Sequence, residues 1–204
     1  MKKLLICGDS FAADWTVKYD VCGWVNLLEK NYKVTNLAQA GCSEYKILKQ
    51  LQSVDLKKFD LVLVSHTSPF RLYVKEHPVH YKDLLHKDSC FLYNDVMSHL
   101  LEYPELTCVA EYFDKYFDIE YAKHIHQLIL KEIDNLCPEK TLHISHMNWD
   151  GLTVFKNFLN FEKTYNQHKG KINHYNVEGN AIIYSSITEH LENLIKRGHY
   201  DTKN

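Results

Sequence analysis

A serine near the N-terminus and a histidine near the C-terminus are the residues of this chain whose types best suit chemistry. Ser10 follows a short apolar run, Lys3 to Cys7, that Gly8 ends. The run is too short for a helix and is typical of a buried strand. A hydroxyl on the turn after a central strand lies where open α/β sheets bind their ligands. His174 could serve such a hydroxyl as a general base, because a neutral imidazole takes up and returns protons near neutral pH.

Each of these two residues has a commoner role when it is considered alone. A serine after a strand is more often a turn or helix N-cap residue, and a histidine such as His174 is more often part of a loop. The elements that would have to bring Ser10 and His174 together therefore decide between the two interpretations.

Those elements alternate between strand and helix patterns along the chain. Strands are predicted at residues 3–7, 32–37, 59–64 and 141–145, and helices at 23–30, 44–54, 120–137, around 152–158 and from about 181 to 194. Alternation of this kind predicts an α/β fold with a parallel sheet between layers of helices.

Three blocks of residues resemble the conserved blocks of the SGNH (GDSL-type) hydrolases. Gly8-Asp9-Ser10 resembles the first block, the segment from Asn36 to Ser43 the second, and residues 171–180 the last. The resemblance implies that Ser10 is the nucleophile, that His174 is the base and that the backbone N–H of Gly41 helps to bind an oxyanion. Glycine suits that position because a substrate must approach the chain closely. Taken alone, a glycine such as Gly41 is more often a loop glycine, here before a helix capped by Ser43.

The third block is altered in this chain. Where the family usually has Gly-x-Asn-Asp, the residues after the strand at 59–64 are His66, Thr67, Ser68 and Pro69. Ser68, in the place of the asparagine, could still donate its hydroxyl proton to an oxyanion. Arg71 could bind an anionic or polyol group of a substrate, or could be a surface or salt-bridged arginine.

The last block lacks the usual acid, because Lys171 stands three residues before His174, where the family has aspartate. A lysine cannot orient the imidazole or stabilise its cation as a carboxylate does. Three explanations remain open. A backbone carbonyl could orient the ring of a Ser-His dyad, a carboxylate such as Asp150 or Glu178 could replace the acid, or the fold could bind a ligand without catalysis. The amide of Asn173 could also hold or cover the imidazole.

Residues 72–120 have no counterpart in the family pattern and are interpreted as an insertion rich in histidine, tyrosine and phenylalanine, with helices around 92–101 and 107–117. Its aromatic side chains could form a wall of the binding pocket and stack on sugar rings, or simply form a core. The pairs His77-x-x-His80 and His143-x-x-His146 lack the context of a known metal motif. We therefore expect no metal and no cofactor.

Composition narrows the choice of partners. The 204 residues carry 24 basic and 26 acidic side chains, a net charge of −2, which does not favour a nucleic acid or an anionic membrane as partner. No run of about 18 apolar residues is present and the first residues show no signal-peptide pattern, so we expect a chain that is neither exported nor membrane-spanning. Six cysteines without a C-x-x-C pair are typical of a reduced, cytoplasmic protein. No pattern indicates an oligomeric state.

These observations predict one domain over residues 1–204, a three-layer α/β/α sandwich with a central parallel sheet and a flavodoxin-like topology. The resemblance implies a serine esterase that cleaves a short, acetyl-like ester on a small molecule or a glycan. The alternatives are a glycan O-acyltransferase that uses the same site and an inactive ligand-binding protein. A large separation between Ser10 and His174 would favour the inactive protein.

Overall fold

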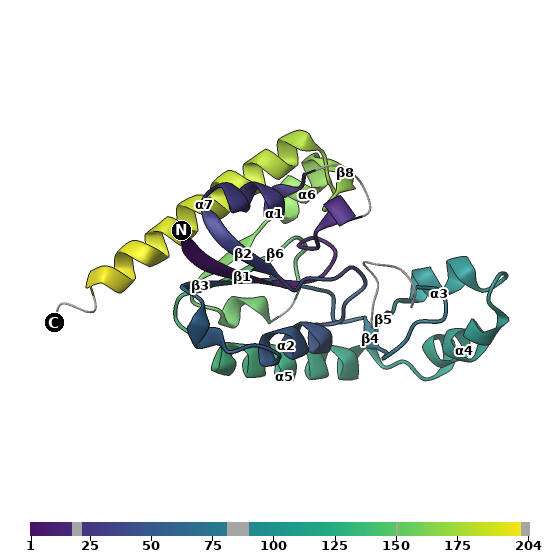
Figure 1. Ribbon diagram of the computed structural model, residues 1–204. Coiled ribbons are helices and arrows are strands. Elements are labelled where there is room, and N and C mark those ends of the chain that lie inside the picture. Colours follow the sequence, from purple (N-terminus) through teal and green to yellow (C-terminus); the bar gives the residue numbers. More distant parts are fainter. Residues whose placement is uncertain (18–21, 81–89, 150, 201–204) are drawn as a thin grey trace.

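A five-stranded parallel sheet lies at the centre of the molecule (Figure 1). The computed structural model describes residues 1–17, 22–80, 90–149 and 151–200. The strands of the sheet are β1 (Lys2–Gly8), β2 (Tyr32–Asn36), β3 (Leu61–His66), β6 (Thr141–Ser145) and β7 (Phe158–Asn160). Their order, β2-β1-β3-β6-β7, runs 2-1-3-4-5 when the strands of this sheet are counted along the chain, which is the flavodoxin-like order. The predicted fold class and topology are confirmed.

Helices cover both faces of the sheet and complete three layers (Figure 1). One layer holds α1 (Trp24–Leu27), η2 (Leu28–Lys30), α6 (Glu162–Gln167) and α7 (Val177–Tyr200), and the other holds α2 (Glu44–Gln52) and α5 (Ile119–Leu136). Side chains of β1 alternate between the two cores: Leu4 and Ile6 belong to the first, Leu5 and Cys7 to the second. This two-residue period is that of a strand buried on both faces.

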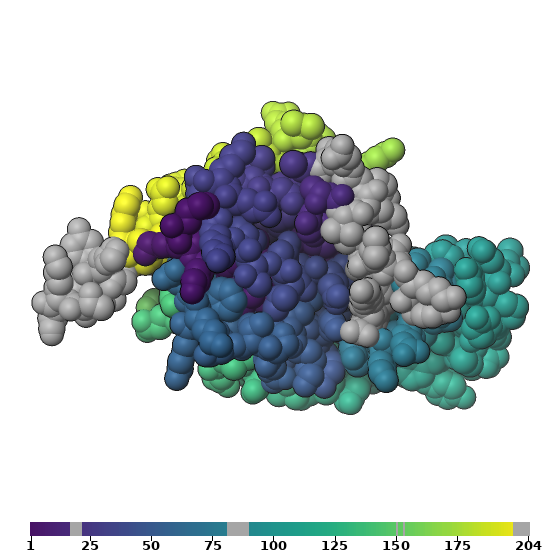
Figure 2. Space-filling model, viewed as in Figure 1, coloured from purple at the N-terminus to yellow at the C-terminus, as the bar shows by residue number. Residues whose placement is uncertain are grey.

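Residues 72–80 and 90–115 supply a small lobe beside the carboxyl ends of the strands (Figures 1 and 2). An antiparallel pair, β4 (Leu72–Tyr73) and β5 (Cys90–Phe91), connects it to the sheet. It continues through α3 (Tyr93–His99), η4 (Pro104–Leu106) and α4 (Thr107–Lys115), so both helices predicted here are confirmed. The buried core of the lobe consists of Val96, Leu106 and Ala110 among the described residues.

The prediction of a helix around residues 152–158 is wrong. The chain forms a short turn of 3₁₀ helix, η5 (Leu152–Val154), and then the edge strand β7, which pairs with β6. A three-residue strand is too short to show a two-residue period, so the sequence pattern could not reveal it. Further short elements are η1 (Trp15–Val17), η3 (Leu56–Lys58) and β8 (Lys169–Ile172), which forms bridges to Tyr175 rather than joining the sheet. No helix in the described ranges has the length and apolarity that a membrane span requires.

Candidate active site

Ser10 and His174 meet at the carboxyl end of β1 although 164 positions separate them. Ser10 lies on the turn that follows the strand, and its residue is 8% exposed. Its Oγ lies 2.8 Å from Nε2 of His174. At that distance the hydroxyl can donate its hydrogen bond to an unprotonated Nε2, which is the arrangement that a base-activated nucleophile needs.

Buried Asp9 shapes the turn that carries Ser10. Its Oδ1 accepts the N–H of Phe11 at 3.1 Å, and its Oδ2 accepts the hydroxyl of Thr67 at 2.8 Å. An Nη of Arg71 lies 3.5 Å from Oδ2, and the same guanidinium donates to the carbonyl of Cys42 at 3.1 Å. Burial raises the pKa of Asp9 despite the opposing charge of Arg71. Asp9 and Arg71 thus link the turns after β1, β2 and β3.

Arg71 is therefore a salt-bridged residue, one of the two roles that its sequence context allowed. Its Nε is buried and has no hydrogen-bond partner among the residues described. Binding of a substrate group by Arg71 stays a prediction.

Aromatic rings hold the imidazole of His174. Its centroid lies 4.3 Å from that of Phe11, and the ring of Trp15 meets it edge-on at 6.0 Å. The indole N–H of Trp15 also donates to the carbonyl of Ser10 at 2.8 Å. One side chain thus contacts both members of the Ser10–His174 pair, and packing restricts the orientation of the ring.

Asn173 does not hold the imidazole, contrary to that expectation. Its side-chain amide donates to the carbonyls of Phe11 and Ala13, at 2.9 and 2.8 Å, and so fastens the turn after β1 to the last loop. Both Asn173 (φ 48°) and His174 (φ 66°) adopt left-handed backbone conformations, which are uncommon outside glycine. Contacts rather than local preference must maintain this loop, and the two amide bonds of Asn173 are among them.

The close contact between Gly23 and Asn173 leads to a first prediction. A Cβ on Gly23 would lie 1.6 Å from Oδ1 of Asn173, which is fully buried and held by its amide. We expect Gly23→Ala to lower the free energy of unfolding by about 1 to 3 kcal/mol, since the crowded groups must shift. Urea unfolding measures this. Gly151→Ala is not a suitable control because of its positive φ, whereas an exposed change such as His124→Ala should alter stability by less than about 0.5 kcal/mol.

No carboxylate forms a hydrogen bond with His174 within the described parts of the chain. Glu178, one candidate, is 75% exposed and lies 3.5 Å from His168 instead. Asp150, the other, is outside the described residues, and Lys171 is exposed. Burial lowers the pKa of His174 below its ordinary value, although the charge of Asp9 acts in the opposite direction. The imidazole is therefore neutral at pH 7, as a general base must be.

The two residues expected to bind an oxyanion lie on the neighbouring turns. Gly41 has φ 71°, a left-handed conformation that suits glycine, and its carbonyl accepts the N–H of Cys90 at 2.8 Å. Within the described ranges the backbone N–H groups of Ser10 and Gly41 donate no hydrogen bond. Oγ of Ser68 accepts the N–H of Phe70 at 3.2 Å, which leaves its own proton available for another acceptor.

A cavity of about 330 Å³ lies between α2, α5 and the lobe. Ser68 and Arg71 line it, and they also line a smaller hollow together with Asp9 and Phe11, the two neighbours of Ser10. The aromatic rings around the larger cavity belong to Tyr45, Tyr73, Tyr112, Phe117 and Tyr121. Three of these lie within residues 72–120, so the insertion does contribute to the wall of a pocket.

A buried polar cluster lies beside the turn after β3, and the sequence did not reveal it. Glu44 accepts the N–H of Thr67 at 3.0 Å and lies 2.8 Å from Nδ1 of His66, while Nε2 of His126 lies 3.4 Å from its carboxylate. Nε2 of His66 in turn contacts Nδ1 of His143 at 3.0 Å. Burial alone would raise the pKa of Glu44, but the two flanking histidines hold it well below its usual range.

This cluster fixes the backbone that leads to Ser68. The position of Glu44 in the first turn of a helix was visible in the sequence, but a solvated helix N-terminus gives the same signal.

Comparison with known proteins reveals likeness to solved structures only. No protein-family model matches the chain, and no curated protein matches it. One similar structure is a member of the lipolytic G-D-S-L family from Veillonella parvula, with 14% identity, a TM-score of 0.48, and coverage of 92% of this chain and 96% of that one.

A GDSL-like lipase from Bacteroides thetaiotaomicron has 13% identity, a TM-score of 0.44, and coverage of 94% and 88%. A further structure, described as an acylhydrolase from Bacteroides fragilis, has 12% identity, a TM-score of 0.34, and coverage of 98% and 88%.

Proposed function

We propose that this protein is a serine ester hydrolase in which Ser10 is the nucleophile and His174 the general base. The distance of 2.8 Å between Ser10 Oγ and His174 Nε2 carries the proposal. Three further features support it: the neutral state of the buried imidazole, the position of Ser10 at the carboxyl end of a parallel strand, and the free N–H groups of Ser10 and Gly41 in the described residues.

The proposed reaction has two halves. Ser10 Oγ attacks the ester carbonyl while His174 Nε2 takes up its proton, and the carbonyl oxygen becomes an oxyanion held by the N–H groups of Ser10 and Gly41 and by the hydroxyl of Ser68. His174 then returns the proton to the alcohol oxygen as the C–O bond breaks, which leaves an acyl group on Ser10. Water, activated by the same imidazole, releases the acid and restores the hydroxyl.

This mechanism uses a dyad rather than a triad. Packing against Phe11 and Trp15 orients His174. The charge of Asp9 favours the imidazolium without a hydrogen bond, and the charge of Arg71 opposes it. We therefore expect slower turnover than in enzymes with a hydrogen-bonded carboxylate, because such a partner can contribute up to about 10⁴-fold.

The proposed substrate is a short-chain acyl ester of a carbohydrate. The cavity beside Ser68 and Arg71 is of the size that small ligands occupy, and its five aromatic rings offer flat apolar faces on which a sugar ring can stack.

A fluorophosphonate probe tests the proposal directly, because it reacts with activated serines. The purified chain should be labelled, and digestion followed by mass spectrometry should place the label on the peptide that contains Ser10. Ser10→Ala should remove it and should also remove p-nitrophenyl acetate hydrolysis above the rate of buffer. Ser43→Ala is a matched control, since Ser43 is also a buried serine on a loop of this edge and should remain dispensable for labelling. Absence of labelling in the folded wild-type chain would point to a ligand-binding protein without catalysis.

A further inference from the structure

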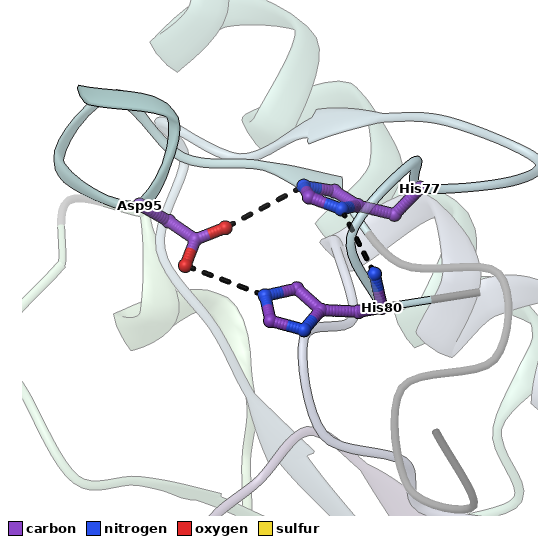
Figure 3. A group of neighbouring side chains, drawn as sticks. All are labelled: His77, His80 and Asp95. Atoms are coloured by element: carbon purple, nitrogen blue, oxygen red, sulfur yellow. Dashed lines mark hydrogen bonds and ion pairs between the residues drawn. The ribbon is translucent and has the colours of Figure 1, made fainter. Parts of the chain in front are cut away.

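Three side chains of types that can ligate a metal converge in the lobe (Figure 3). His77 and His80 come from the chain after β4, and Asp95 lies in the first turn of α3. Nε2 of His77 lies 3.4 Å from Oδ2 of Asp95, and Nε2 of His80 lies 3.5 Å from Oδ1. One donor atom from each residue falls within 4.8 Å of the others.

We propose that these three residues bind a Zn²⁺ ion. Zinc takes histidine nitrogen and carboxylate oxygen at about 2.0 to 2.2 Å in a tetrahedral arrangement, so neighbouring donors lie about 3.3 to 3.6 Å apart. Each histidine nitrogen lies at about that spacing from a different oxygen of Asp95, at 3.4 and 3.5 Å, which exceeds the usual length of a hydrogen bond, and one donor from each of the three residues lies within 4.8 Å of the others. The proposal replaces the earlier expectation of no metal, because the sequence alone did not place Asp95 beside the two histidines.

The buried nitrogen of His77 supports a ligand other than protein. The His77 side chain is fully buried, and its Nε2 makes no hydrogen bond with any described residue. Figure 3 shows this nitrogen directed toward the carboxylate of Asp95, on the side where His80 also points. A buried polar atom without a hydrogen bond is costly, and a cation between the three side chains would remove that cost.

Three protein ligands that leave a fourth position open match the zinc sites that keep a water ligand. Two ligands in an H-x₂-H turn face a third on a helix, and His99 follows Asp95 by four residues on the same face, with Nδ1 3.5 Å from Oδ1 of Asp95. Nδ1 of His99 lies 2.9 Å from the backbone carbonyl of Asp95, so His99 helps to orient the Asp95 segment rather than completing the set. A water molecule would occupy the fourth position.

The lobe has a small apolar core, so a bound metal ion would add to its stability. Its described core contains three buried apolar residues, Val96, Leu106 and Ala110, which is little for a unit that projects from the main body. Small units of this kind are commonly stabilised by a metal or a disulfide, and the six cysteines of this chain are free. Zinc would tie the turn at 77–80 to α3.

Two backbone contacts of His77 oppose coordination and define the competing state. The N–H groups of Val79 and His80 face Nδ1 of His77 at 3.2 and 3.4 Å, and a neutral ring that accepts them carries its proton on Nε2. Binding of Zn²⁺ at Nε2 moves that proton to Nδ1. Nδ1 can then no longer accept the N–H groups of Val79 and His80, so these two long hydrogen bonds are lost. The competing state is a metal-free cluster in which the histidines contact Asp95.

Zinc titration of the full-length, tag-free chain separates the two states. After treatment with a chelator, the wild type should take up one equivalent of Zn²⁺, and its melting temperature should rise with zinc and fall with the chelator. His80→Ala and Asp95→Asn should weaken binding at least about 100-fold and remove the thermal shift. The control His124→Ala removes an exposed histidine of α5 and should bind as the wild type does.

Uptake of no zinc by the wild type, or equal uptake by the wild type and Asp95→Asn, would overturn the proposal. Circular dichroism shows whether each variant folds. A second measurement needs no variant: Co²⁺ bound to the wild type should give the intense visible absorption of a tetrahedral site, and the weak spectrum of hydrated Co²⁺ would argue against it.

Discussion

His174→Ala is expected to lower kcat/KM for p-nitrophenyl acetate about 100- to 10,000-fold. The wild-type imidazole lies 2.8 Å from Ser10 Oγ and is the group that can take its proton. Without it the hydroxyl must ionise unaided at a pH far below its pKa. The variant should retain its fold, because the ring is held by packing against Phe11 and Trp15 and carries no further hydrogen bond within the described ranges. Steady-state kinetics, with fluorophosphonate labelling as an independent readout, measure the loss.

The pH dependence of kcat/KM distinguishes a general base from a residue with a purely structural role. Activity requires the neutral ring, and burial lowers its pKa below the ordinary value of about 6.5. The acid limb of kcat/KM should therefore lie below pH 6.5, so that the enzyme stays active in mildly acidic buffer. His124→Ala, which removes an exposed histidine, should leave both the rate and the profile unchanged. Activity of His174→Ala within twofold of wild type would remove the basis for the proposed dyad.

Acidification from pH 7 to pH 5 is expected to destabilise the protein through two buried histidines. Burial lowers the pKa of His143 to about 2 and that of His146 to about 3. In the unfolded chain both should titrate near 6.5. Between these values the unfolded state binds more protons than the folded state, so stability falls as the pH falls. Each ring contributes about 1.4 kcal/mol per pH unit below 6.5, or about 2 kcal/mol at pH 5.

Two such contributions are a large share of a typical stability of about 5 to 15 kcal/mol. The environment of His146 shows why it stays neutral: its ring stacks on Phe11 at 4.4 Å, its Nδ1 contacts the hydroxyl of Tyr175 at 2.6 Å, and the residue is 1% exposed. No carboxylate compensates a charge there within the described residues.

Urea unfolding at pH 7, 6 and 5 tests this prediction. The quantity compared between variants is the slope of the free energy of unfolding against pH. His146→Gln removes one titrating ring, so its stability should depend on pH less steeply than that of the wild type, by about 1.4 kcal/mol per pH unit below 6.5. Contributions from other groups, including Asp9 with its raised pKa, are common to both proteins and cancel. His124→Gln should keep the wild-type slope. Equal slopes for wild type and His146→Gln would show that His146 is not a buried neutral ring.

The sequence by itself determined the layered fold and indicated the two residues that we propose as nucleophile and base. Apolar runs such as residues 3–7 reveal a buried strand because hydrophobic periodicity is a local property of the chain, and the alternation of such runs with amphipathic helices specifies a parallel sheet. Ser10 and His174 were paired before any distance was known because residues 8–10 and 171–180 resemble the first and last blocks of one family pattern, not because the topology required it.

Only the tertiary structure decided how the site is held and what else the chain brings together. Lys171 indicated that an acid was missing, but not that Phe11 and Trp15 pack against the imidazole, nor that Asn173 binds the turn after β1 instead of the ring. Glu44 and His143 lie far apart in sequence and meet through His66. Asp95 joins His77 and His80 only because the first turn of α3 faces the segment at 77–80. Contacts of this kind depend on packing between distant segments, and a local pattern of residue types carries no record of them.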